Sequence, residues 1–133
     1  MFNSKILNII GLVLIFLSLS MIPSALWNIS EFSIPNYYSD ISAIVKSVLV
    51  TFSAGIILYI ITKKSRNSLS NELTSKDGFI IVSLGWISMA IFSALPYYFS
   101  SYGFTYTDAF FESMSGLTTT GASILGTNAL AEI

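Results

Sequence analysis

Cysteine and histidine are both absent from this chain of 133 residues, and charged residues make up only 10% of it. The chain therefore cannot build a cysteine- or histidine-based zinc site, a thiol nucleophile, a disulfide or a histidine general base. A soluble domain typically carries about a quarter charged residues, and the net charge of −1 provides no basic surface for nucleic acid. We expect no enzyme, no transition-metal site, no cofactor and no nucleic-acid partner.

Apolar residues are abundant, at 53% of the chain, and the mean hydropathy is +0.75. Three apolar stretches reach the roughly 20 helical residues that a bilayer requires, so we predict transmembrane helices over 6–27, 41–62 and 78–99. The first stretch exceeds the length of a signal-peptide core, and Pro23 disfavours cleavage after Ala25. Aromatic residues that favour the headgroup layer lie at the ends of these stretches: Trp27, Tyr37, Tyr38, Tyr97, Tyr98 and Tyr102.

The basic residues are distributed unevenly between the predicted loops. The loop 28–40 has no lysine or arginine, whereas the N-terminus and the loop 63–77 carry Lys5, Lys63, Lys64, Arg66 and Lys76. By the positive-inside rule, the N-terminus and the loop 63–77 face the cytoplasm. Lys46 lies inside the second stretch, where it either extends to the headgroups or pairs with a buried partner.

The pattern changes after the third stretch. Residues 106–116 resemble a short helix with Thr107 or Asp108 as N-cap, with Asp108 and Glu112 in its first half and Gly116 as its stop signal. Such a helix covers about half of the hydrocarbon core and cannot span it. The following residues 117–125 are rich in threonine and poor in helix formers. Because irregular backbone at membrane depth must be buried in protein or bathed in water, we predict a re-entrant pore helix followed by a filter loop.

The composition of this loop suits the coordination of a potassium ion. Backbone carbonyls can replace the water of a dehydrated ion, and Gly121 allows backbone angles that turn them toward one axis. The C-terminus of the short helix adds partial negative charge. Two other interpretations exist: an external polar loop around Thr118–Gly121, or an enzyme that uses Asp108 and Glu112 as a carboxylate pair. Stabilisation of the helix start explains Asp108 without any chemistry.

At these residues the chain closely resembles the Trk/Ktr/HKT superfamily of potassium transporters, in particular the TrkH branch. The similar segments are Asp77-Gly-Phe-Ile-Ile-Val82, Ser93-Ala-Leu-Pro96 and Thr107-Asp-Ala-Phe-Phe-Glu-Ser-Met-Ser-Gly-Leu-Thr-Thr-Thr-Gly-Ala-Ser123. The resemblance implies that Thr118, Thr119, Thr120 and Gly121 form one filter segment, flanked by Ala122, that coordinates potassium through backbone carbonyls. It also implies a pore of four repeats, a homodimer and a cytosolic nucleotide-binding regulatory subunit of the TrkA type. The location that it implies is the bacterial cytoplasmic (inner) membrane.

The expected organisation is an N-terminal transmembrane hairpin over 1–62, a cytoplasmic loop over 63–77, and an incomplete first pore repeat over 78–133. One filter segment cannot enclose an ion, so we expect a truncated segment of a potassium uptake subunit that is inactive without the remaining repeats. The alternative is a small three-span accessory or interaction protein of the membrane. That alternative accounts for the spans but not for the short helix followed by Thr-Thr-Thr-Gly.

Overall fold

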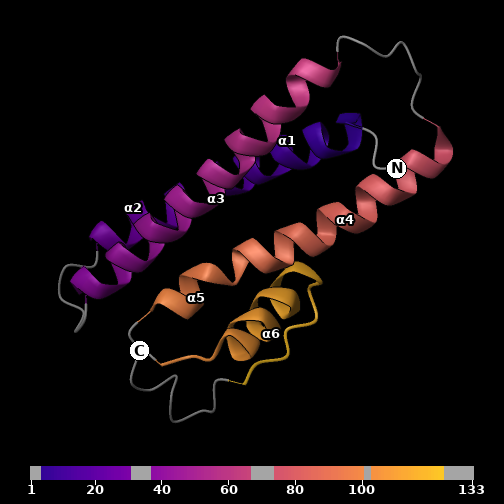
Figure 1. Cartoon of the computed structure of the whole chain (residues 1–133). Helices are drawn as coiled ribbons and strands as arrows, with labels where there is room; N and C mark the ends of the chain where they lie inside the picture. Colours follow the sequence, from indigo (N-terminus) through magenta and orange to yellow (C-terminus); the bar gives the residue numbers. More distant parts are fainter. Residues whose placement is uncertain (1–3, 31–36, 67–73, 101–102, 125–133) are drawn as a thin grey trace.

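The structure is a computed structural model that describes residues 4–30, 37–66, 74–100 and 103–124 (Figure 1). The regular elements within these residues are helices: α1 (Ser4–Ser20), α2 (Ile22–Ser30), α3 (Tyr37–Arg66), α4 (Ser75–Ser93), α5 (Leu95–Phe99) and α6 (Tyr106–Leu117). In this part of the chain, three helical stretches are long and apolar enough to cross a membrane: Ser4–Leu26, Asp40–Lys63 and Ser75–Phe99. These findings confirm the predicted all-α class and its three spans.

Two of the spans are interrupted close to a proline. The helix breaks at Met21, two residues before Pro23, and again at Ala94, two residues before Pro96. Proline has no N–H to donate to the fourth preceding carbonyl, and its ring disturbs that turn. Around Met21 the N–H is shared between the carbonyls of Leu17 (3.2 Å) and Ser18 (3.3 Å). Each span is therefore a long helix followed by a shorter one, α1 with α2 and α4 with α5.

The N-terminal hairpin is held together by close approach of the α1 and α3 backbones. Residues of α3 spaced four apart form its buried face, namely Ala43, Ser47, Thr51 and Gly55. A Cβ added to Gly55 would lie 2.9 Å from the carbonyl oxygen of Gly11 on α1. Small residues allow such contact, which supplies the van der Waals packing that holds helices together in lipid.

A polar contact closes the other part of the same interface. The Asn8 amide nitrogen donates to the Thr62 hydroxyl at 3.1 Å and to the Tyr59 carbonyl at 3.3 Å. Thr62 in turn donates to the Leu58 carbonyl at 2.6 Å. Because Asn8 is only 3% exposed, these bonds satisfy an amide that would otherwise be costly in an apolar environment. The Lys46 side chain lies exposed on α3, away from this interface.

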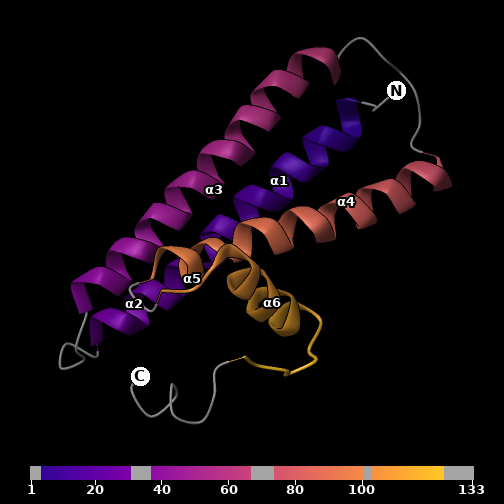
Figure 2. The ribbon, with the colours of Figure 1, turned by 60° about the horizontal axis from the view of Figure 1, so that its bottom comes forward.

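The helix α1 lies between α3 and α4, as Figure 2 shows, and contacts both. The start of α4 is fixed by a capping box in which the Thr74 hydroxyl and the Asp77 carboxylate each bond the other residue's backbone N–H. After the break at Ala94, α5 packs against α3, and α6 then folds back against α4 and α5 (Figure 1). The three spans thus form one packed group that supports α6.

Candidate functional site

The start of α6 is fixed by a second capping box, between Thr105 and Asp108. The Thr105 hydroxyl accepts a bond from the Asp108 N–H at 3.2 Å, and the Asp108 carboxylate accepts one from the Thr105 N–H at 3.2 Å. The prediction of Thr107 or Asp108 as N-cap was wrong, because Thr105 holds that position. The signal was present in the sequence, since Thr105-Tyr-Thr-Asp108 repeats the Thr-x-x-Asp spacing of Thr74-Ser-Lys-Asp77.

One face of α6 is attached to α4. Ala109 is fully buried, and the Ser113 hydroxyl bonds the Ser93 hydroxyl and also lies 3.4 Å from the Ala90 carbonyl as a donor. The Tyr106 hydroxyl donates to the Ile91 carbonyl at 3.2 Å. These contacts come from residues three to four positions apart, which share one helix face. They fix the orientation of α6 on α4, and with it the position of the C-terminal end of α6.

The end of α6 is a Schellman-type turn with an unusual residue in its left-handed position. The Thr120 N–H donates to the Ser115 carbonyl at 3.0 Å and the Thr119 N–H to the Gly116 carbonyl at 3.2 Å. Thr119, after the C-cap Thr118, has φ +55°. Gly116 was expected to stop the helix, but it lies inside α6, and Thr119 takes the place that glycine usually holds. A β-branched residue in this region is a clear outlier, and such strain concentrates at functional sites.

The threonine hydroxyls are tied to the turn itself. Thr118 donates to the Met114 carbonyl at 2.8 Å, and its oxygen lies 2.8 Å from the Thr120 hydroxyl. Thr119 donates to the Thr118 carbonyl at 2.7 Å. Gly121 follows with φ +71°, a conformation that favours glycine, as expected for this position. The segment Thr118–Gly121 is therefore a sharply turned stretch of backbone that lies exposed on the described part of the chain.

Beyond this turn the chain returns beside α6 (Figure 1). One carboxylate oxygen of Glu112 accepts bonds from the Ser123 hydroxyl and from the Ile124 N–H, both at 2.7 Å. Ala122 lies exposed between Gly121 and these contacts. Glu112 was predicted to lie in the first half of the helix, where the dipole favours negative charge, but it is residue seven of the 12 in α6. That reason for its presence was wrong, because the dipole effect is confined to the first turn.

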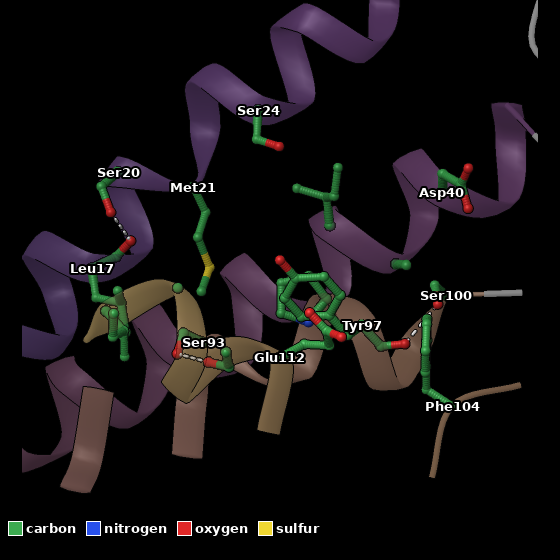
Figure 3. A pocket seen from close by; sticks show the side chains of 16 residues that line it. Leu17, Ser20, Met21, Ser24, Asp40, Ser93, Tyr97, Ser100, Phe104 and Glu112 are labelled. Carbon is green, nitrogen blue, oxygen red and sulfur yellow. Dashed lines mark hydrogen bonds between the residues drawn. The ribbon is translucent and has the colours of Figure 1, made fainter. Parts of the chain in front are cut away.

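A cavity of about 680 Å³ lies between the hairpin and α6 (Figure 3). Its lining combines Met21, Asp40, Pro96, Tyr97 and Glu112 with other residues of α1, α3, α5 and α6. The segment Thr118–Gly121 is not part of this lining. Within the described residues no group of three or more His, Cys, Asp or Glu side chains could hold a metal ion. The cavity is therefore separate from the Thr118–Gly121 turn.

Comparison with known proteins identifies the family. A family model described as TrkH, a cation transport protein, matches residues 41–130, which is more than half of the chain. This chain belongs to the TrkH family. The Trk system potassium uptake protein TrkH of Halomonas elongata is 36% identical over 123 residues, and that of Escherichia coli K12 is 39% identical over 123 residues. TrkG of the same E. coli strain is 39% identical over 88 residues, which cover 60% of this chain and 17% of TrkG.

The matches to both TrkH proteins cover 90% of this chain and 23% of the relative. The chain therefore spans about a quarter of the length of the curated relatives it matches. The family model covers α3 from residue 41 onward, then α4, α5 and α6 with the turn that follows, so all eight predicted site residues lie inside it. The structure places Asp108, Glu112 and Gly116 on α6, and Thr118–Gly121 with Ala122 directly after it.

Proposed function

We propose that this chain supplies the first pore element of a Trk-type potassium uptake subunit. In this proposal α6 is the re-entrant pore helix and Thr118–Gly121 is one filter segment, which contributes backbone carbonyls to a ring around a potassium ion. The N-terminus and the connection between α3 and α4 face the cytoplasm. The names of the relatives support potassium as the transported ion.

The observation that carries the proposal is the shape of the chain around α6. A helix of 12 residues is about 18 Å long at the usual rise of roughly 1.5 Å per residue, too short for a bilayer. The chain reverses at Thr119, passes through Gly121 at φ +71° and returns beside the same helix. A chain that enters a membrane and leaves on the side of entry takes this form, and the strained turn would lie at its deepest point.

Four such segments would be needed to surround an ion, and one threonine-glycine segment leaves most of the coordination shell open. We therefore propose that uptake requires further pore repeats, arranged in a homodimeric protein with a cytosolic nucleotide-binding subunit of the TrkA type. The basic residues Lys63, Lys64 and Arg66 at the end of α3 and Lys76 at the start of α4 are on the side where such a subunit would bind. On this proposal residues 1–133 alone do not restore growth of a potassium-uptake-deficient strain on limiting potassium.

The test compares two glycines with nearly the same positive φ. Gly121 and Gly103 have φ +71° and +72°, and neither has an atom within 4 Å of an added Cβ. A serine at either position costs roughly 1–2 kcal/mol of backbone strain, but only Gly121 belongs to the proposed filter. We expect Gly121→Ser to lower the preference for potassium over sodium, and Gly103→Ser to leave it unchanged, in uptake by the complete gene product at matched expression. Equal selectivity of the two variants would remove the filter assignment.

A further inference from the structure

The segment that follows the turn is attached to α6 through one side chain. A single oxygen of Glu112 accepts from both the Ser123 hydroxyl and the Ile124 N–H, each at 2.7 Å. These partners lie 11 and 12 residues further along the chain. Distances of this length are typical of strong, charge-assisted hydrogen bonds. The contact therefore joins the middle of α6 to the irregular segment that returns beside it, at Ser123 and Ile124.

The Thr118–Gly121 segment is consequently fixed on both sides. On the helix side the Thr119 and Thr120 N–H groups are bonded to α6 carbonyls. On the other side the Glu112 carboxylate holds Ser123 and Ile124. Between these two attachments lie Gly121 and Ala122, which have little side chain of their own to fix the backbone. The positive φ of Gly121 is thus maintained by contacts at its two ends.

The position of Glu112 on α6 needs an explanation other than helix stability. It is the seventh residue of 12, beyond the first turn where a negative charge benefits from the helix dipole. A carboxylate inside a membrane protein is costly unless its oxygens are bonded. The two bonds from Ser123 and Ile124 satisfy one of the two carboxylate oxygens, at the place where backbone geometry would determine ion coordination.

We propose that Glu112 is a positioning residue for the Thr118–Gly121 segment. It acts as a hydrogen-bond acceptor that holds the segment with Ser123 and Ile124 against α6. It thereby sets the direction of the backbone carbonyls between the end of α6 and Ser123. The inference rests on the proposed function for its effect on ions, but the attachment itself does not. In this proposal the attachment depends on an acceptor oxygen at the distance that a glutamate side chain provides. The negative charge of the side chain contributes less.

Three substitutions separate reach from charge. Glu112→Gln keeps an acceptor oxygen at the same distance and removes the charge, whereas Glu112→Asp keeps the charge and shortens the side chain. Glu112→Ala removes both. Ser123→Ala is a milder variant, because it removes one of the two bonds and leaves α6 itself unchanged. Thr107→Ala, an exposed position on the same helix, is the matched control.

The first measurement is hydrogen–deuterium exchange at the Ile124 amide, in the complete gene product reconstituted in lipid. The loss of an amide hydrogen bond exposes the amide to exchange, and the expected increase in rate is up to roughly tenfold. We expect this increase in Glu112→Ala and Glu112→Asp, a smaller one in Ser123→Ala, and little change in Glu112→Gln and Thr107→Ala. Unchanged exchange in both Glu112→Ala and Ser123→Ala would overturn the attachment and leave the proposed function untouched.

The second measurement is the preference for potassium over sodium in uptake by the same variants. Reduced preference in Glu112→Ala and Glu112→Asp, with Glu112→Gln close to the unsubstituted protein, would support positioning. Retained preference in Glu112→Asp with loss in Glu112→Gln would show that charge is the important property and would overturn the proposal. Hydrogen–deuterium exchange does not depend on transport. It therefore tests the attachment through Glu112 separately from the assignment of Thr118–Gly121 as a filter.

Discussion

Gly11 of α1 and Gly55 of α3 face each other so closely that a Cβ on either would lie 2.9–3.0 Å from the other's carbonyl oxygen. A real side-chain carbon does not tolerate such a distance from backbone, so the two helices would have to separate. The separation would weaken the packing along the whole row of small residues on α3. The hairpin therefore depends on the absence of a side chain at these two positions.

Gly55→Ala should destabilise the protein by roughly 1–3 kcal/mol, the usual cost of overpacking. The matched control is Gly85→Ala in α4, where an added Cβ meets no atom within 4 Å. The better helix propensity of alanine should leave that variant neutral or slightly stabilised, by up to about 1 kcal/mol. Equilibrium unfolding in mixed detergent micelles, followed by helicity, measures both. Equal stability of the two variants would contradict the close Gly11–Gly55 contact.

Thr105→Ala should loosen the first turn of α6, because it removes the hydroxyl that caps the Asp108 N–H at 3.2 Å. Loss of such a cap typically costs about 1 kcal/mol, or roughly fivefold faster exchange of the capped amide. Thr107→Ser should have almost no effect, since the Thr107 side chain is exposed and does not cap the helix. Hydrogen–deuterium exchange at the Asp108 amide distinguishes the two variants. Faster exchange in Thr107→Ser than in Thr105→Ala would identify Thr107 as the N-cap instead.

Thr119→Gly should stabilise the turn after α6 while impairing its function. At φ +55° a threonine carries strain of about 1–2 kcal/mol that glycine relieves. The same change removes the hydroxyl bonded to the Thr118 carbonyl at 2.7 Å. Thr120→Gly is the control, because Thr120 is not among the described residues with positive φ, and it should destabilise the protein instead. Unfolding and ion selectivity are measured together. A Thr119→Gly protein that is less stable would exclude strain at this position.

Topology can be tested at two exposed residues, Ser75 at the start of α4 and Thr107 at the start of α6. The basic residues at the end of α3 and the start of α4 (Lys63, Lys64, Arg66 and Lys76) predict that Ser75 lies on the cytoplasmic side. Thr107, beyond the next span, should then face outward. In intact cells an impermeant thiol reagent should label Thr107→Cys and leave Ser75→Cys unlabelled until the membrane is permeabilised. The reverse pattern would invert the orientation.

Hydropathy was sufficient to predict the spans, because twenty or so consecutive apolar residues suit lipid better than any other environment. The structure places the three candidate spans within a few residues of the expected stretches. The short helix before Thr118 was also anticipated, since Gly121 and the threonines cannot continue it. These features depend on local composition, which a single sequence records directly.

The finer structure depends on contacts that no local pattern encodes. Thr119 was not expected in a left-handed conformation, because β-branched residues rarely adopt it and Gly116 was the better local candidate. The role of Glu112 arises only after the chain has reversed and brought Ser123 and Ile124 to its side. The Gly11–Gly55 contact likewise requires the relative register of two helices. Tyr102, which was predicted to lie at the end of the third span, falls outside the described residues.

The break in the helix before Pro96 gives α5 two neighbours. This short helix packs on α3 and on α6, and it also contacts α4. Five residues thus bridge the helical hairpin and α6. A change in the tilt of α3 would therefore reach α6 through α5, although α3 and α6 are more than 30 residues apart in the sequence.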